Sequence, residues 1–191
     1  MKKLCIALAA CATLGTSFIA CANEHSVSLG YAQSKFQAFT LKGLNFKYRN
    51  EWDSSLSVIT SLTALGHTSP SELAYEEKTT TMSAVNAKFT YISLAVGPAY
   101  RINNFVSIYS LIGYNRSSVR FEGQSLNIPT EKIKNFKNDE HSHSMMYGAG
   151  IQINPLDNIT VDLGYEGTKV KSTKDKKDAV NGFNIGVGVR F

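Results

Sequence analysis

The chain of 191 residues carries a net charge of +5, and its length fits one domain of ordinary size. A charge this small gives no reason to expect a nucleic acid as partner. The three cysteines are Cys5, Cys11 and Cys21, so the rest of the chain contains none and cannot be held together by disulfides.

The N-terminal segment has the pattern of a secretory signal peptide. A positively charged start precedes an apolar run over residues 4–20, and the run ends at the small residues Ala20 and Ala22. Small residues at these two positions are typical of a cleavage site, so residues 1–22 are predicted to be removed from the exported protein. The mature protein is therefore predicted to comprise residues 23–191.

Lipidation of Cys21 is the alternative interpretation of this segment. The four residues that end at Cys21 begin with Phe18, which is a poor start for a lipoprotein signal. Cleavage after Ala22 removes all three cysteines and two lysines, and the net charge then falls from +5 to +3. The mature protein is thus predicted to be exported, free of cysteine and only modestly basic.

Residues 182–191 (GFNIGVGVRF) alternate strictly between two kinds of side chain. One face of the strand carries only apolar residues, from Phe183 to Phe191, whereas the other carries asparagine, glycine and Arg190. Transmembrane β-barrel strands have this pattern, with apolar residues toward lipid, polar residues toward the lumen and aromatic residues at the interfaces.

Seven earlier segments show related alternation. They are residues 26–34, 43–52, 56–65, 89–100, 105–114, 145–153 and 159–167. The pattern is interrupted at Ile59, and both faces of 105–114 carry apolar residues, so alternation alone leaves the orientation of that strand open. After residue 22 no apolar run reaches the length of about 18 residues that a membrane helix needs.

The connections between these eight segments alternate in length. Three are short turns at 53–55, 101–104 and 154–158, and four are longer loops at 35–42, 66–87, 122–142 and 169–181. Outer-membrane barrels combine an even number of strands with short periplasmic turns and longer extracellular loops. The chain is therefore predicted to be an all-β protein, an eight-stranded antiparallel transmembrane β-barrel with that arrangement of turns and loops.

Six charged residues fall on the inward faces of these strands. They are Lys47, Arg49, Glu51, Asp162, Glu166 and Arg190. The interior of an eight-stranded barrel is just wide enough for side chains to fill, and buried charges persist when they are paired and hydrogen-bonded. We expect a structural network of salt bridges and no open channel, with a proton relay or a pore lining as the functional alternative.

Several blocks of the sequence occur together in one known group of proteins. They are GYAQS (30–34), KGLNFKYR (42–49), GPAYRINN (97–104), SIY (107–109), YGAGIQINPLDNITVDLGYE (147–166) and GVGVRF (186–191). In order and spacing they resemble the Ail/Lom/OmpX family of small enterobacterial outer-membrane proteins, which includes attachment-invasion and serum-resistance proteins. The resemblance implies an outer-membrane location, and it implies that Phe191 belongs to the outer-membrane assembly signal. A monomer is expected.

The sequence gives little support to an enzyme. A lipid A deacylase of this barrel class would need a histidine and a serine on one strand face, two residues apart. In the segment HSHS (141–144) this spacing pairs histidine with histidine and serine with serine. His141 and His143, with Asp139 and Glu140, are weak candidates for a metal site, but a solvated loop is the simpler interpretation. No metal and no cofactor are expected.

Lysine-rich loops are the candidate binding surfaces. The residues singled out are Lys132, Lys134, Phe136 and Lys137 in the loop 122–142, and Lys174, Lys176 and Lys177 in the loop 169–181. Exposed lysines attract lipopolysaccharide phosphates or sulfated host glycans, and an aromatic residue among them can anchor a protein partner. The alternative is that these lysines only keep the loops soluble.

The resemblance and the loops together define the expected function. We expect a virulence-related outer-membrane surface protein that mediates adhesion to or invasion of host cells, serum (complement) resistance, or both. Its expected partners are outer-membrane lipid and lipopolysaccharide, the outer-membrane assembly machinery, and host matrix or complement-regulatory proteins. The alternative is an OmpX-like structural or envelope-integrity protein without a host ligand.

Overall fold

The computed structural model describes residues 24–36, 39–52, 54–69, 72–76, 81–127, 132–171 and 177–191. The predicted signal peptide with Ala20, Cys21 and Ala22, and the loop lysines Lys174 and Lys176, lie outside these residues. For Lys132, Lys134, Phe136 and Lys177 the backbone alone is described.

Nine strands make up most of the described part of the chain. They are β1 (Glu24–Phe36), β2 (Phe39–Glu51), β3 (Leu56–Thr68), β4 (Glu72–Glu76), β5 (Thr81–Arg101), β6 (Val106–Asn127), β7 (Lys132–Leu156), β8 (Ile159–Lys171) and β9 (Lys177–Arg190). Among the described residues, no helix is long and apolar enough to cross a membrane.

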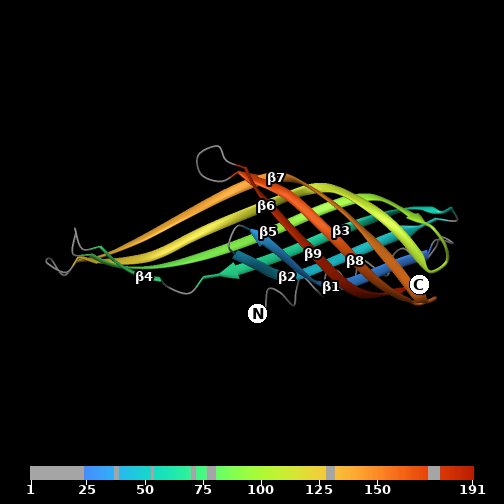
Figure 1. The fold of residues 1–191 in the computed structure, drawn as a ribbon, viewed down its shortest axis with the longest axis horizontal. Coiled ribbons are helices and arrows are strands. Elements are labelled where there is room, and N and C mark those ends of the chain that lie inside the picture. The colour runs from blue at the N-terminus through green and yellow to red at the C-terminus, as the bar shows by residue number, and fades with distance from the viewer. Residues whose placement is uncertain are drawn as a thin grey trace.

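Eight of these strands close into a ring (Figure 1). Each is antiparallel to its neighbours in the order β1-β2-β3-β5-β6-β7-β8-β9, and β9 returns to pair with β1. β4 lies outside the ring and pairs with the first residues of β5, Thr81–Val85. A barrel in lipid requires closure of this kind, because an open edge would leave backbone groups without hydrogen bonds. The predicted eight-stranded antiparallel β-barrel is confirmed.

The two faces of the barrel wall have opposite character. Outward-facing side chains are apolar and exposed: Leu29 is 51% exposed, Leu94 58% and Val187 65%. Inward-facing side chains are mostly polar and buried, as Ser61 and Thr63 are. Alternation with a period of two thus separates an apolar outer belt from a polar interior.

The structure settles two orientations that alternation left open. Ile59, which interrupts the pattern of β3, faces inward and is fully buried in an apolar cluster with Ala95. β6 turns Ile108 outward, so its neighbours in sequence Tyr109 and Leu111 belong to the interior and join the same cluster. The interior is therefore polar with one apolar patch, rather than polar throughout.

The predicted loop boundaries are wrong, because most of the residues assigned to the long loops continue the neighbouring strands. β6 runs to Asn127 and β7 starts at Lys132, inside the predicted loop 122–142. The other loops, 35–42, 66–87 and 169–181, shrink in the same way. Side-chain alternation disappears where both faces of a strand meet water, although the backbone pairing continues.

The long strands form a sheet that projects from one end of the barrel (Figure 1). We call it the blade and define it as β4 with residues 81–90 of β5, 115–127 of β6 and 132–145 of β7. The short connections lie at the opposite end, the turn end. One of them is held by Asn103, whose side-chain oxygen accepts hydrogen bonds from the backbone of Phe105 (2.9 Å) and Val106 (2.8 Å).

Candidate functional site

Three arginines converge on one buried carboxylate at the turn end of the barrel. Glu51 Oε2 lies 3.3 Å from Arg190 Nη2 and 3.5 Å from Arg49 Nη2. Arg101 donates hydrogen bonds to the same oxygen of Glu51 and, at 3.1 Å, to Glu24, which also accepts one from Arg190. Because β5 and β9 lie on opposite sides of the ring, these contacts connect the wall across the interior.

A second ion pair lies deeper in the interior. Lys47 Nζ pairs with Asp162 Oδ1 and donates a hydrogen bond to Asn184 Oδ1 at 2.5 Å. The Tyr109 hydroxyl donates to the same Asp162 oxygen at 3.0 Å, and the Tyr109 ring centroid lies 5.3 Å from Lys47 Nζ. Both charged side chains are 1% exposed, so their pairing offsets the cost of removing them from water.

Two glycines leave the space that this ion pair and its tyrosine occupy. A Cβ atom at Gly150 would lie 2.2 Å from the Tyr109 hydroxyl, and one at Gly164 would lie 2.6 Å from the same oxygen. The Cβ at Gly164 would also approach Lys47 Nζ to 3.1 Å. A larger residue at either position would displace the partners of Asp162.

Glu166 is buried without a cationic partner among the described residues. Its carboxylate accepts hydrogen bonds from Thr63 Oγ1 at 2.9 Å and from Ser61 Oγ at 3.2 Å. The side-chain amides of Asn45 (3.4 Å) and Asn184 (3.3 Å) also donate to it. At this level of the interior, hydroxyl and amide donors therefore stand in place of an ion pair.

The structure places all six predicted interior residues inside the barrel and divides them into three groups. The groups are Arg49 with Glu51 and Arg190, Lys47 with Asp162, and Glu166 by itself. Sequence reasoning missed Glu24 and Arg101. Arg101 continues the inward phase of Ala95 and Ala99, which was the available signal, but it falls in a predicted turn.

Apolar side chains fill the interior toward the blade. The cluster consists of Ala32, Leu41, Leu65, Phe89, Tyr91 and Val180. Phe36 packs on it, with ring centroids of Phe36 and Phe89 5.1 Å apart. The interior thus changes from charged at the turn end to apolar at the blade end.

Phe191 lies at the seam between β1 and β9. His25 N donates to Phe191 O at 2.7 Å, and Phe191 N donates to His25 O at 2.9 Å. The ring of Phe191 stays exposed, with its centroid 6.0 Å from that of His25. His25 also stacks on Tyr48, whose hydroxyl lies 3.0 Å from His25 Nδ1. The residue predicted to belong to the assembly signal therefore lies where the barrel closes.

The blade carries exposed charged residues in cross-strand pairs. Arg120 Nε donates to Asp139 Oδ1 at 2.7 Å, and Lys137 Nζ lies 3.4 Å from Glu122 Oε1. The hydrogen bond from Arg120 holds the pKa of Asp139 below its ordinary value. Because these pairs face water, each contributes little to stability. Lys137, one of the predicted binding residues, is exposed here.

One edge of the blade is unpaired. β7 pairs with β6 from Lys132 to Ile153, whereas its pairing with β8 begins only at Met146. Within the described residues, the backbone of 132–145 therefore has no strand on its second side. The opposite edge is covered, because β5 pairs with β3 up to Lys88 and with β4 from Val85 toward the tip. An unpaired edge presents a row of N–H and C=O groups to a partner strand.

The two histidines of the blade lie on β7, where His141 is opposite Ser118 and His143 is opposite Arg116. Tyr114 stacks on His143, with ring centroids 5.7 Å apart. Within the described part of the chain, no group of three metal-ligating side chains comes together. The observed contacts of these histidines are therefore their strand partners and, for His143, the stacked ring of Tyr114.

The closed ring and its wall define the class of the protein. An antiparallel ring of eight strands with an exposed apolar belt and a filled interior describes a small outer-membrane β-barrel. The sequence model of the enterobacterial Ail/Lom protein family matches residues 1–191, and the chain belongs to this family.

Relatives of the chain cover nearly its whole length. The virulence membrane protein PagC of Salmonella typhimurium is 40% identical over 183 residues, which cover 91% of this chain and 90% of PagC. The attachment invasion locus protein of Yersinia enterocolitica is 35% identical over 204 residues, and outer membrane protein X of Escherichia coli is 35% identical over 196, each with 100% of both chains covered. The crystal structure of Ail from Yersinia pestis, in complex with the heparin analogue sucrose octasulfate, is similar with a TM-score of 0.68 and 30% identity, covering 88% of this chain and 99% of that one.

These similarities confirm the predicted family, the outer-membrane location and a virulence-related role at the cell surface. Because outer-membrane barrels have short periplasmic turns and longer extracellular loops, we assign the turn end to the periplasm and the blade to the cell exterior. The family and the fold are those of outer-membrane adhesion and structural proteins rather than of known enzymes.

Proposed function

We propose that this protein attaches the bacterium to host cells, and supports their invasion, through the blade. The observation that carries the proposal is the unpaired edge of β7 over residues 132–145, which projects from the barrel. A relative that covers the whole chain is named for attachment and invasion, and another, which covers 91% of it, for virulence. An extended segment of a host matrix protein would add to the edge as a further strand, and its backbone would supply the missing hydrogen bonds.

Serum resistance follows from the same surface if the added strand belongs to a complement-regulatory protein. A regulator held at the blade would protect the cell from complement. Strand addition depends on the backbone for affinity and on alternate side chains for specificity, so one edge is compatible with more than one protein partner.

The lysines of the blade favour a sulfated or otherwise anionic partner. A relative from Yersinia pestis holds the heparin analogue sucrose octasulfate in its crystal structure. Exposed Lys88 on β5 lies in register with Arg120 on β6, so the blade carries a further lysine two strands away from the free edge. The candidate contacts are Lys132, Lys134, Lys137, Lys174, Lys176 and Lys177, with Phe136 as an apolar anchor. Because such attraction is electrostatic, binding should weaken as salt is added.

The membrane and its assembly machinery complete the proposed partners. The exposed lysines would also pair with lipopolysaccharide phosphates, and the barrel would act as a monomer.

The two ends of the chain have proposed roles in export and assembly. Cleavage after Ala22, without lipidation of Cys21, gives a mature chain, and the mass of that chain identifies its first residue. Phe191 is proposed as part of the signal that the assembly machinery reads, so its deletion should reduce the heat-modifiable protein in the outer membrane. An unchanged amount would contradict that role.

Expression in a non-adherent laboratory strain tests the adhesive function. The strain should gain host-cell adhesion and serum survival. The edge is tested by two proline pairs, Asn138→Pro with Glu140→Pro and Asp139→Pro with His141→Pro. N–H groups of successive residues point to opposite sides of a strand, so one of these pairs removes donors from the free edge.

Alanine at the same four positions is the matched control, because it removes the side chains and keeps the N–H groups. The proline pair on the free edge should lower adhesion by about tenfold and the alanine pair by less than about twofold. Heat-modifiability verifies that the barrel is intact. Adhesion that survives both proline pairs would exclude the edge as the binding site.

A structural role in envelope integrity, without a host ligand, is the second candidate. It is favoured by the 35% identity with outer membrane protein X over 100% of both chains. A deletion strain with altered detergent sensitivity and unchanged adhesion would support it. Exchange of residues 66–87 and 122–142 with those of a non-adhesive relative separates the two candidates, because only the adhesive function should move with these segments.

A further inference from the structure

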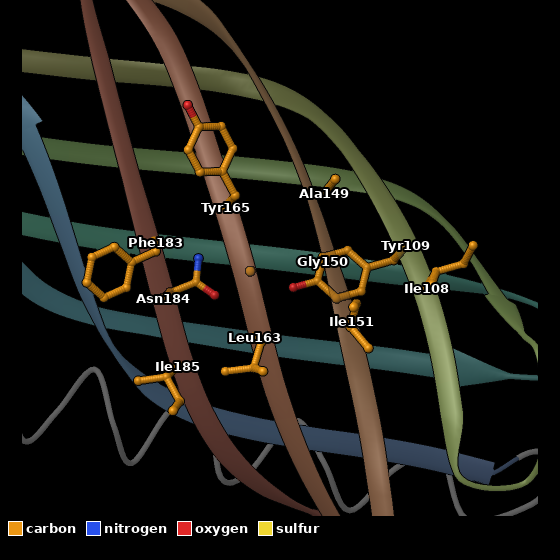
Figure 2. Close-up of a pocket in the computed structure, with 11 residues that line it drawn as sticks. Ile108, Tyr109, Ala149, Gly150, Ile151, Leu163, Tyr165, Phe183, Asn184 and Ile185 are labelled. Atoms are coloured by element: carbon orange, nitrogen blue, oxygen red, sulfur yellow. The ribbon is translucent and has the colours of Figure 1, made fainter.

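A hollow of about 740 Å³ opens on the outer wall over four neighbouring strands, β6 to β9 (Figure 2). Leu163, Ile151 and Ile185 lie on one side of it, and Tyr165 and Ala149 lie on the other. Leu163 is the cross-strand neighbour of both isoleucines, and Ala149 is that of Tyr165. The hollow exists because the small Ala149 stands beside large apolar residues on the exposed face of the wall.

Two glycines, with a buried tyrosine behind them, form the floor of the hollow. It includes the glycines Gly150 and Gly164, which are opposite each other on β7 and β8. Behind them the interior is occupied by Tyr109, whose hydroxyl is hydrogen-bonded to Asp162. The wall is therefore supported from the inside at the point where it is thinnest, and the hollow does not lead into the lumen.

On β8 and β9 the hollow lies in the outer half of the apolar belt. The belt residues of β8 run from Ile159 near the turn end to Tyr165. The next outward positions toward the blade are Gly167, opposite Asn181, and then the exposed Lys169. On β8 and β9 the residues around the hollow are thus the last large apolar residues before the polar surface of the cell, whereas on β6 and β7 the belt continues toward the blade with Ile112 and Tyr147.

We propose that this hollow seats one acyl chain of the phosphorylated glycolipid of the outer leaflet, lipopolysaccharide. At this depth hydrocarbon is the surrounding solvent, and an apolar hollow in the wall gives one chain more contact than the convex belt beside it. Lys169 lies about 13 Å along β8 from Tyr165, at 3.3 Å per residue, which is the level of a phosphorylated headgroup. This inference deepens the lipopolysaccharide contact of the proposed function and is independent of the adhesive role of the blade.

The test uses the barrel in nanodiscs that contain lipid A with a photoactivatable diazirine in one acyl chain. After illumination, labelled residues are mapped by mass spectrometry. We expect labelling concentrated on the residues that line the hollow. Ala149→Phe, which fills it, should reduce that labelling at least about twofold, because the acyl chain then loses van der Waals contacts with the wall.

The matched control is Ala64→Phe, at an exposed outward alanine between Leu44 and Ile92 on the other side of the barrel. It should leave the labelling of the hollow unchanged. Ala149→Leu is a milder filling variant with the same expected direction, and heat-modifiability shows that each variant is folded. Uniform labelling around the belt, or equal effects of the two phenylalanines, would overturn the proposal. Equal labelling by a diazirine-bearing phosphatidylethanolamine would overturn the assignment to the glycolipid.

Discussion

The barrel wall and the blade are built from the same continuous strands but differ in what surrounds them. In the wall one face meets lipid and the other meets the filled interior, so apolar and polar side chains alternate. Toward the tip of the blade both faces meet water, and residues 137–141 are all exposed. The pairing of β6 with β7 nevertheless continues through Arg120 opposite Asp139. Alternation therefore reports the surroundings of a strand and not whether a strand exists.

The two regions also differ in how their charges are stabilised. Lys47 and Asp162 are 1% exposed, so each depends on its partner for compensation. Arg120 and Asp139 keep contact with water and lose little when their pair is broken. Substitutions in the wall should therefore change stability far more than equivalent substitutions in the blade.

The largest effect is expected for Lys47→Ala in the wall. It leaves the buried Asp162 without its cation, and it should lower the free energy of unfolding by about 3–5 kcal/mol. Urea unfolding of the barrel in lipid vesicles measures this change. The double variant Lys47→Met with Asp162→Leu removes both charges and should recover most of the loss. If it is as unstable as the single variant, packing rather than charge explains the effect.

A smaller loss is expected for Gly164→Val. Its Cβ would lie 2.6 Å from the Tyr109 hydroxyl, and the resulting overpacking should cost about 1–3 kcal/mol in the same unfolding experiment. Gly66→Val is the matched control near the blade, because a Cβ there meets only Phe89 O at 3.7 Å. Equal losses at both glycines would mean that strand propensity and not the crowded interior determines the cost.

Glu166→Gln should have a weaker effect than the loss of Lys47. No ion pair of Glu166 is found in the described part of the chain, and glutamine retains an oxygen for the Thr63 hydroxyl. We expect a change of about 1 kcal/mol in the free energy of unfolding, the scale of one altered hydrogen bond. A loss as large as that of Lys47→Ala would show that Glu166 balances a cation of the interior after all.

The smallest effect is expected for Arg120→Gln in the blade, where the pair faces water and the unfolding midpoint at neutral pH should fall only slightly. The pKa of Asp139 lies below 3.8 because Arg120 donates a hydrogen bond to it, so the variant should raise this pKa toward 3.8. A carboxyl group whose pKa is lower in the folded than in the unfolded protein stabilises the fold at pH values above the unfolded pKa. This contribution is lost as the pH falls through the folded pKa. Carbon-detected NMR titration of the Asp139 carboxyl measures the shift. An unchanged pKa in the variant would contradict the pairing.

Strand number, closure and the inward position of six charged residues could be predicted because lipid imposes a period of two on the wall. The pairing among those residues could not, since it depends on contacts across the ring. Arg101 illustrates this limit: its partner Glu51 lies on a strand that is not its neighbour, and no local pattern marks the contact. The length of the strands in the blade could not be predicted either, because strands with water on both sides lack the alternation of apolar and polar side chains by which strands are recognised.

The seam between β1 and β9 bears on how the protein is made. Ser26 pairs with Arg190, so two strands separated by most of the chain must meet before the wall is complete. Until β9 arrives, β1 has an open edge, and Arg190 is missing from the carboxylates at the periplasmic end. The wall therefore cannot close before the last residues of the chain have taken their places, and the ion pairs of Arg190 form only with that closure.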